Sequence, residues 1–377
     1  MKDQRHGQLA HLLVNYSVAL KPGESCLIQA VDVPVEMVEA LVEAVYNAGG
    51  YPQVRLLSER LHRVMLAQAS EESLQRQADA EGYQMERMDA FIGIRGHQNP
   101  LETALISDNR HALYMKRFNH PVHHLIRIPK TKWVVLRYPT PTMAYQAGLP
   151  TEDFESFYYA VTAEVDYGRM SRAMDSACAY IDQADQVRII GPGTNLSFSI
   201  KGMGSVKCDG HRNIPDGEIY TAPVRDSVEG KITYNVPSTY QGYTYRDITF
   251  VFRQGKIVEA GANNTGRINA LLDTDRGSRY IGEFALGVNP GIINPMDETL
   301  FDEKIMGSFH FTPGAAYASC DNGNESAIHW DLVSIQRPET GGGEIWMDGE
   351  LIRKDGLFVH EAFLGLNPER LTEENIT

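Results

Sequence analysis

The chain has 377 residues, which is enough for two domains that each bury a core. Apolar residues make up 42% of the sequence and charged residues 22%, as in an ordinary globular enzyme. The net charge of −14 argues against a general nucleic-acid binder, because phosphate binding requires a basic surface.

The N-terminal residues and the cysteines indicate the cellular compartment. Residues 1–6 are too polar to open a signal peptide, and no stretch approaches the roughly 18 apolar residues of a membrane span. The four cysteines lie far apart, without CxxC spacing, and are expected to be reduced thiols. We therefore expect a cytoplasmic protein with neither a membrane nor a nucleic-acid partner.

The first half alternates predicted strands and helices. Residues 25–31 form an apolar strand, a helix with apolar positions from Met37 to Val45 follows, and residues 52–57 resume strand character. Such a β-α-β unit implies a parallel sheet covered by helices. The pattern continues with strands at 90–94 and 132–136 and helical segments at 109–118 and 152–181. We predict an N-terminal α/β domain with a mostly parallel sheet over residues 1–184.

The second half has a different pattern, because helical stripes give way to short strands and tight turns. Three turn-forming dipeptides separate strand-like runs, namely Gln254-Gly255, Asp348-Gly349 and Asp355-Gly356. One helix is expected near residues 266–273. The predicted fold class is therefore α/β, with a C-terminal β-rich α+β domain over residues 185–377.

Two motifs favour a structural interpretation over a ligand site. The sequence Gly191-Pro192-Gly193-Thr194 follows a strand, but it lacks a third glycine, and its proline removes an amide that a phosphate would need. A turn is the better prediction there. His120, His123 and His124 flank a proline near a predicted helix end, which indicates polar surface residues rather than a metal cluster.

Two glutamates lie in apolar surroundings. Glu218 follows a Pro-Asp-Gly turn and enters a strand, and Glu283 interrupts the apolar run 279–287, where glycines let other backbone approach closely. A carboxylate in such a run is costly unless it is paired or bound to a cation. A structural hydrogen bond and a metal site are both open for each glutamate.

Two histidines and an aspartate follow downstream. Residues 326–333 alternate polar and apolar types, which predicts a strand that presents His329 and Asp331 on one face. A polar face with one hydrogen-bonded histidine is the alternative to a metal site. Together with His310 and the two glutamates, these residues make a ligand set for two divalent ions. Oxygen and imidazole donors favour Zn, Co or Mn.

The sequence resembles the aminopeptidase T / aminopeptidase S family of two-metal aminopeptidases. The resemblance rests on segments that run along the chain in the family's order: residues 12–17, 21–24, 213–218, 221–223, 281–287, 302–307, 309–317 and 327–331. It implies a co-catalytic metal pair and an active-site tyrosine at Tyr317. The implied ligands of the metal pair are Glu218, Glu283, His310, His329 and Asp331.

The resemblance also implies an architecture. The family has an N-terminal α/β domain, a C-terminal domain that carries the metals, and a homodimer that encloses the active sites. The segment between His310 and His329 is shorter here than expected for the family. This difference leaves the ligands intact and bears on access to the site.

The implied reaction is the release of N-terminal amino acids from peptides by a water that two metal ions activate. Glu218 or Glu283 would take the proton of the water, and Tyr317 would donate a hydrogen bond to the oxyanion. A non-haem Fe(II) ring-cleaving dioxygenase is one alternative, because His310, His329 and Asp331 would suffice for one iron. A non-catalytic metal- or peptide-binding relative is the other. Retention of both glutamates favours two metals and hydrolysis.

Overall fold

A computed structural model describes residues 3–372, which form two compact units. The first unit comprises Met1–Glu164 and Gly210–Ile214, and the second comprises Val165–Asp209 and Pro215–Thr377. A parallel sheet occurs in the first unit and antiparallel sheets in the second, so the predicted fold class is confirmed. The division into folding domains after residue 184 stays a prediction.

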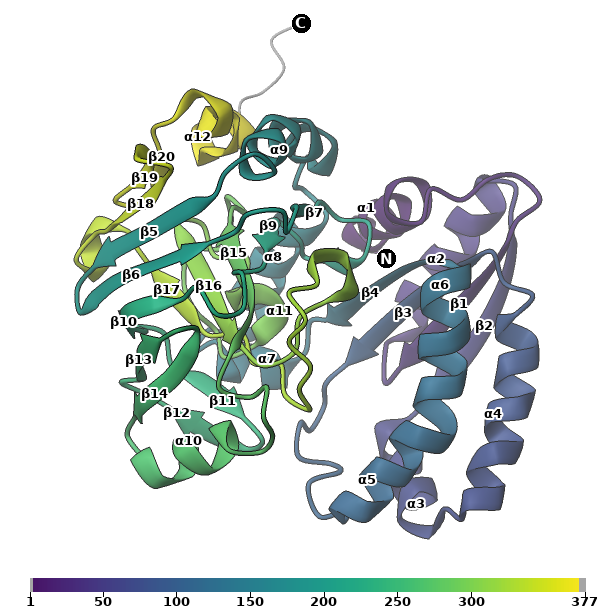
Figure 1. The fold of residues 1–377 in the computed structure, drawn as a ribbon. Helices are drawn as coiled ribbons and strands as arrows, with labels where there is room; N and C mark the ends of the chain where they lie inside the picture. Colours follow the sequence, from purple (N-terminus) through teal and green to yellow (C-terminus); the bar gives the residue numbers. More distant parts are fainter. Residues whose placement is uncertain (1–2, 373–377) are drawn as a thin grey trace, which may run out of the picture. The chain divides into compact units, whose positions relative to one another are not determined.

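The first unit is built on a five-stranded sheet in the order β2-β1-β3-β4-β8. Figure 1 shows β2, β1, β3 and β4 of this sheet. Each neighbouring pair of strands runs parallel, as the β-α-β pattern predicts. The strands are β1 (Ser25–Val31), β2 (Tyr51–Leu57), β3 (Ala90–Gly96), β4 (Lys132–Tyr138) and β8 (Asn213–Ile214). The helices are α1 (Gln4–His11), α2 (Val35–Asn47), α3 (Glu59–Gln68), α4 (Glu71–Met85), α5 (Asp108–Tyr114), α6 (Ile128–Lys130), α7 (Pro141–Gln146) and α8 (Thr151–Thr162).

Two helical predictions differ from the structure at their ends. The helix predicted for residues 109–118 continues after α5 through the π-helical segment Met115–Arg127 and ends with α6. Pro121 lies inside this segment, although a proline usually ends a helix, because its ring clashes with the preceding turn. His120, His123 and His124 therefore lie within a helix and not at its end. The region 152–181 forms two helices, α8 and α9 (Tyr167–Ile181).

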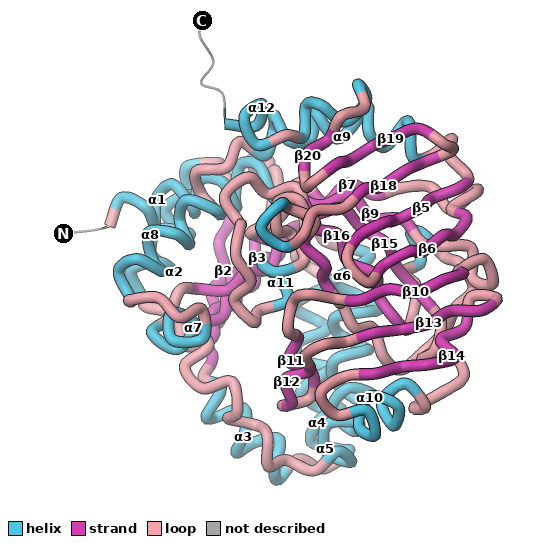
Figure 2. The backbone as a smooth tube through the Cα atoms, turned by 90° about the vertical axis from the view of Figure 1, so that its left-hand side faces the viewer, coloured by secondary structure: helices cyan, strands magenta, loops and turns pink. Residues whose placement is uncertain are grey.

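The second unit contains sheets of eight, five and two strands among its described residues (Figure 2). The orders are β14-β13-β10-β6-β5-β18-β19-β20, β17-β16-β15-β9-β7 and β11-β12. The strands are β5 (Gln186–Gly191), β6 (Thr194–Ser199), β7 (Val206–Cys208), β9 (Glu218–Thr221), β10 (Glu229–Thr233), β11 (Ser238–Tyr240), β12 (Tyr243–Tyr245), β13 (Thr249–Arg253), β14 (Lys256–Gly261), β15 (Ile281–Gly287), β16 (Ser308–Pro313), β17 (Val333–Ile335), β18 (Glu344–Met347), β19 (Glu350–Lys354) and β20 (Leu357–Phe358). The α-helices besides α9 are α10 (Thr265–Leu272), α11 (Thr299–Asp302) and α12 (Pro368–Thr372).

The predicted turns of this unit are confirmed. Gln254-Gly255 joins β13 to β14, Asp348-Gly349 joins β18 to β19, and Asp355-Gly356 leads into β20. All six residues have positive φ, as the tight turns of hairpins require. The motif that begins at Gly191 is the turn between β5 and β6, and α10 lies where a helix was predicted.

Aromatic side chains join the eight-stranded sheet to the five-stranded sheet. The Phe198 ring of β6 lies 5.1 Å from the Phe284 ring of β15 and 5.0 Å from the Phe311 ring of β16, between centroids. Phe252 of β13 packs edge-to-face on Phe311 at 5.9 Å. Burial of several such rings contributes about 1.5–3 kcal/mol each to folding and fixes which face of β15 and β16 points into the core.

The cysteines and the helices bear on the environment of the chain. Cys26, Cys178, Cys208 and Cys320 are free thiols. Between residues 3 and 372, no helix combines the length and the apolar character that crossing a bilayer requires. A cytoplasmic location stays a prediction.

Glycines in β15 let neighbouring backbone lie against the strand, as the sequence predicts. A Cβ at Gly282 would stand 2.2 Å from the carbonyl oxygen of Ala315, and a Cβ at Gly287 would stand 2.3 Å from that of Ile305. These atoms belong to backbone, which cannot swing aside as a flexible side chain does. The two positions therefore require glycine for packing.

We expect Gly282→Ala to destabilise the protein by about 1–3 kcal/mol, because the added methyl forces the segment of Ala315 away from β15. Gly7→Ala is the matched control, since a Cβ there meets nothing within 4 Å and lies in a helix. Urea unfolding followed by circular dichroism measures both. Equal midpoints for the two variants would contradict the packing argument.

Candidate metal centre

Strand register places three of the predicted ligands on one face of the five-stranded sheet. Ala285 of β15 is opposite both Tyr220 of β9 and His310 of β16, and Gly287 is opposite Glu218. Since side chains alternate along a strand, Glu218, Glu283 and His310 share the face opposite to the phenylalanine core. All three are buried, with exposed fractions of 5%, 4% and 0%.

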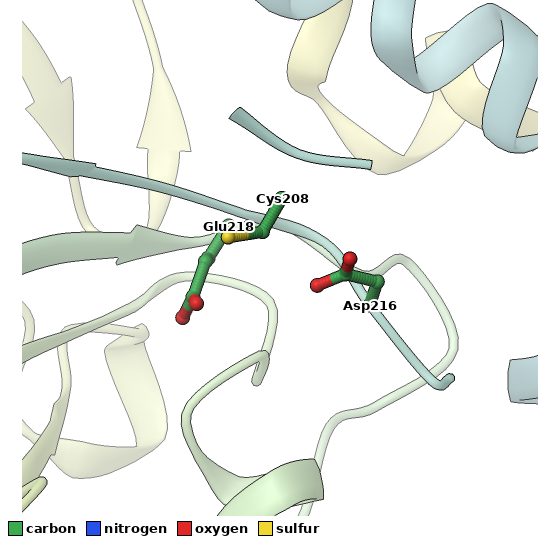
Figure 3. A group of neighbouring side chains, drawn as sticks. All are labelled: Cys208, Asp216 and Glu218. Atoms are coloured by element: carbon green, nitrogen blue, oxygen red, sulfur yellow. The ribbon is translucent and has the colours of Figure 1, made fainter. Parts of the chain in front are cut away.

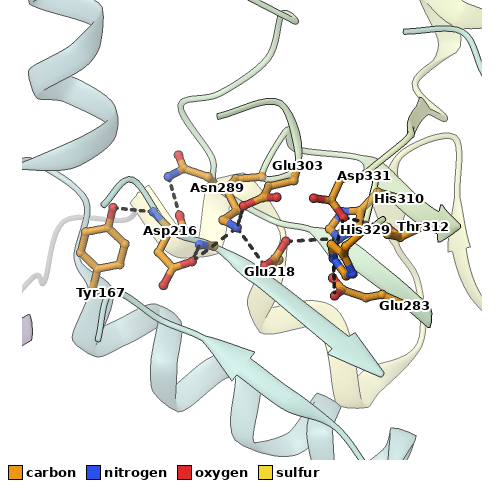
Figure 4. Close-up of polar contacts among 12 residues, drawn as sticks. Tyr167, Asp216, Glu218, Glu283, Asn289, Glu303, His310, Thr312, His329 and Asp331 are labelled. Carbon is orange, nitrogen blue, oxygen red and sulfur yellow. Dashed lines mark hydrogen bonds and ion pairs between the residues drawn. The ribbon is translucent and has the colours of Figure 1, made fainter. Parts of the chain in front are cut away.

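These three side chains contact one another (Figure 4). His310 Nε2 donates a hydrogen bond to Glu283 Oε1 over 2.8 Å and lies 3.6 Å from Glu218 Oε2. Glu218 and Glu283 lie in separate segments of the sequence, and the sheet brings both of them next to the His310 imidazole.

His329 and Asp331 reach the same place from an extended segment. The prediction of a strand over residues 326–333 is wrong, because β17 begins only at Val333 and His329 makes an isolated bridge with Gly314. The alternation itself is confirmed, since Ile328 and Trp330 are 3% and 2% exposed while His329 and Asp331 turn toward the glutamates. The side chains of an extended segment point to alternate sides whether or not a partner strand is hydrogen-bonded to it.

The geometry of His329 fixes the orientation of its ring. Its Nδ1 lies 2.7 Å from the carbonyl oxygen of Ala315, so Nδ1–H donates there and Nε2 faces the acids. Nε2 lies 3.3 Å from Asp331 Oδ1 and 3.6 Å from Glu283 Oε2. Thr312 Oγ1 donates to Asp331 Oδ1 over 2.8 Å and orients that carboxylate.

The structure thus brings together all five predicted ligands in two overlapping groups. The first group is Glu218, Glu283 and His310, and the second is Glu283, His329 and Asp331. Within each group, the ligand atoms all lie within 4.8 Å of one another. Glu283 belongs to both groups, and its two oxygens face different histidines.

The chemistry of this cluster fits divalent metal ions. Glu218 Oε2 and Glu283 Oε2 are buried and have no hydrogen-bond partner among the described residues. An unpartnered buried carboxylate oxygen is costly, and the cluster contains three carboxylates against two imidazoles. Divalent ions that accept oxygen and imidazole ligands would satisfy both the free oxygens and the excess negative charge.

Burial and charge act in opposite directions on the two histidines. Desolvation by itself would lower the pKa of His310, but the hydrogen bond to Glu283 and the nearby carboxylates raise it to about 9. Desolvation would likewise lower the pKa of His329, and Asp331 and Glu283 raise it to about 10. Without metal, both rings are therefore protonated at pH 7.

Tyr317 lies beside the second group. Its ring centroid is 4.5 Å from that of His329 and 5.9 Å from that of Tyr220. The side chain is 51% exposed, so its ring lines an open edge of the cluster. Desolvation and the nearby carboxylates raise the pKa of the phenol, which keeps its proton available for donation.

Two residues that the sequence did not single out hold the cluster in place. Lys304 is fully buried, and its Nζ donates to Glu218 Oε1 over 2.8 Å and contacts Glu303. Asp275 accepts hydrogen bonds from Ser326 Oγ and the backbone N–H of Ala327, which anchors the segment that leads to His329. Both contacts join parts of the chain that are distant in sequence, so no local pattern reveals them.

Comparison with known proteins places this chain in a family of metal-dependent hydrolases. The chain belongs to the thermophilic metalloprotease family M29, whose model matches residues 2–358. This membership confirms both the resemblance to the aminopeptidase T / aminopeptidase S family and the prediction of a metal-dependent hydrolase.

The relatives support the same assignment. Aminopeptidase T of Thermus thermophilus is 27% identical over 91% of this chain and 93% of its own. Aminopeptidase AmpS of Bacillus subtilis is 34% identical, with a match that covers 37% of each chain. The solved structure of AmpT from Thermus thermophilus covers 95% of this chain and 99% of its own, with a TM-score of 0.77 and 23% identity.

One solved structure belongs to a different enzyme class. A 2,5-dihydroxypyridine dioxygenase from Pseudomonas putida covers 96% of this chain and 99% of its own, with a TM-score of 0.60. Its sequence identity is 16%, so the likeness shows a shared fold.

We expect divalent ions to bind with release of protons, because His310 and His329 must lose theirs to become ligands. Affinity for Zn²⁺ should rise by about tenfold per pH unit for each displaced proton while the pH stays below the pKa values of about 9 and 10. Calorimetric titrations in two buffers of different ionisation enthalpy measure the protons released. Binding heats that do not depend on the buffer would contradict this.

The raised pKa values of His310 and His329 also make the stability of the metal-free protein depend on pH. Both histidines have folded pKa values above the unfolded value of about 6.5. Their contacts with the acids therefore stabilise the fold fully below pH 6.5, and this contribution is lost as the pH rises through 9 and 10.

Proposed function

We propose that the protein is an aminopeptidase that uses two divalent metal ions to release N-terminal amino acids from peptides. The observation that carries this proposal is the pair of overlapping ligand groups that share Glu283. The family membership and the aminopeptidase names of its relatives support the peptide substrate.

Each group would hold one ion. Glu218, Glu283 and His310 would bind the first, and Glu283, His329 and Asp331 the second, with Glu283 as the bridging ligand. Zn, Co or Mn fits this oxygen and imidazole set. When bound, such a pair lowers the pKa of a shared water and polarises the scissile carbonyl.

Glu218 and Glu283 are the candidate proton acceptors, and either could act only through an oxygen that is not bound to a metal ion. The ammonium of Lys304 donates a hydrogen bond to Glu218 Oε1 over 2.8 Å. Glu283 has no lysine or arginine partner among the described residues, and its two oxygens face His310 and His329. The glutamate whose oxygen stays free of metal would take the proton of the attacking water and deliver it to the leaving amine.

Tyr317 would stabilise the oxyanion. The phenol lies beside His329 at the exposed edge of the cluster, where a substrate carbonyl would enter, and its raised pKa keeps it a hydrogen-bond donor. The short segment between His310 and His329 forms this edge of the site. Its length therefore bears on which peptides are admitted.

The setting of the reaction follows from the sequence and the resemblance. Free thiols support a cytoplasmic enzyme, and the family architecture supports a homodimer. An Fe(II) dioxygenase that uses His310, His329 and Asp331 remains an outcome of the test, as does a binding protein without catalysis. Glu218 and Glu283, both buried in the cluster, favour the two-metal hydrolase.

We expect Glu283→Gln and His310→Ala to lower kcat/KM for leucine p-nitroanilide by at least about a thousandfold, because each removes a metal ligand. Glu259→Gln and His120→Ala are matched controls outside the cluster and should retain normal activity. Circular dichroism verifies that all four variants are folded. Near-normal hydrolysis by either cluster variant would defeat the proposed site.

We expect Tyr317→Phe to lower kcat by about 10²–10³-fold, as loss of one oxyanion donor does, while metal content stays unchanged. Steady-state kinetics and elemental analysis of the same sample give both quantities. An unchanged kcat would remove Tyr317 from the mechanism and leave the metal ligands in place.

A further inference from the structure

A third group of potential ligands borders the cluster. Cys208 of β7 is directly opposite Glu218 of β9, and Asp216 lies in the turn just before β9 (Figure 3). The ligand atoms of these three residues lie within 4.8 Å of one another. By spacing this group resembles the other two, although it contains a thiol where each of them has an imidazole.

A lysine ammonium occupies this third group. Lys304 has an exposed fraction of 0%, and its Nζ lies 2.8 Å from Glu218 Oε1 and 3.8 Å from Asp216 Oδ1. It also contacts the carboxylate of Glu303. One ammonium therefore lies among three carboxylates, in the position where a cation would offset their charge.

The lysine also determines what Glu218 can offer to the metal centre. Its hydrogen bond takes Oε1, and the other oxygen, Oε2, points toward His310 without a partner. A carboxylate held in this way presents one oxygen and one direction. Its negative charge is partly offset by the adjacent ammonium, so the neighbouring dication is held less tightly.

We propose that Lys304 is a positioning residue that serves as a built-in cation: it takes the place of a third metal ion and commits Glu218 to the metal pair through Oε2 alone. This inference rests on the proposed two-metal site. The inference predicts that the length and charge of the Lys304 side chain limit the number of metal ions in the centre.

The test counts metal ions in the full chain. The metal-free protein is equilibrated with Co²⁺, freed of excess ion by gel filtration and analysed for cobalt per chain. Wild type should bind two ions, and Lys304→Ala should bind three, because the substitution removes the ammonium and leaves space among the acids. The third ion should give a sulfur-to-cobalt charge-transfer absorption from Cys208, absent from wild type and from Lys304→Ala/Cys208→Ser.

Two further variants separate charge from space. Lys304→Met fills the space without the charge, so it should still bind two ions. The more weakly held of the two ions should have a dissociation constant at least tenfold lower than in wild type. Lys207→Ala is the control, since Lys207 is also paired with acids, Asp175 and Asp209, but lies outside the cluster. Its cobalt content should equal that of wild type.

The outcomes for Lys304 and for the proposed function are distinct. A wild-type content other than two contradicts the two-metal site, whereas the difference of one ion between Lys304→Ala and wild type tests the lysine by itself. No extra ion in a folded Lys304→Ala overturns the inference. If Lys304→Ala does not fold, an unchanged dissociation constant in Lys304→Met overturns it.

Discussion

The second unit depends on one contact, in which the Glu283 carboxylate meets the imidazoles of two histidines inside a buried sheet. Glu283 is 4% exposed, and its two oxygens face His310 and His329. Removing a carboxylate from water costs several kcal/mol, which only nearby positive charge can offset. Protonated histidines supply that charge in the metal-free protein, and metal ions would supply it in the loaded enzyme.

The two faces of β15 and β16 explain how such a cluster is kept in place. Phe284 and Phe311 face the eight-stranded sheet, while Glu283 and His310 occupy the other face. A shift of register by one residue would bury the acid in the aromatic core and expose the phenylalanines. The hydrophobic packing of one face therefore fixes the position of the polar groups on the other.

The lysine beside Glu218 gives the cluster an unequal distribution of charge. Lys304 accompanies the first ligand group, and the second group has Thr312 as a neutral donor to Asp331. The two ligand groups are therefore chemically different, although Glu283 belongs to both. Unequal positions suit a reaction in which one ion orients the substrate and the other the water.

Local patterns predicted much of this structure. Apolar runs located β1, β3 and β4, and turn-forming dipeptides located the hairpins, because these features depend on neighbours in sequence. The helix that passes through Pro121 and the extended segment before β17 were misjudged, because tertiary contacts decide both. The roles of Lys304 and Asp275 were missed for the same reason, since their partners lie in distant segments.

Anomalous X-ray diffraction from crystals grown with Zn²⁺ tests the central claim most directly. The account predicts two anomalous peaks per chain, about 3.5–4 Å apart, with Glu283 as the one carboxylate that contacts both. A single peak bound by His310, His329 and Asp331, with Glu218 and Glu283 turned away, would contradict it.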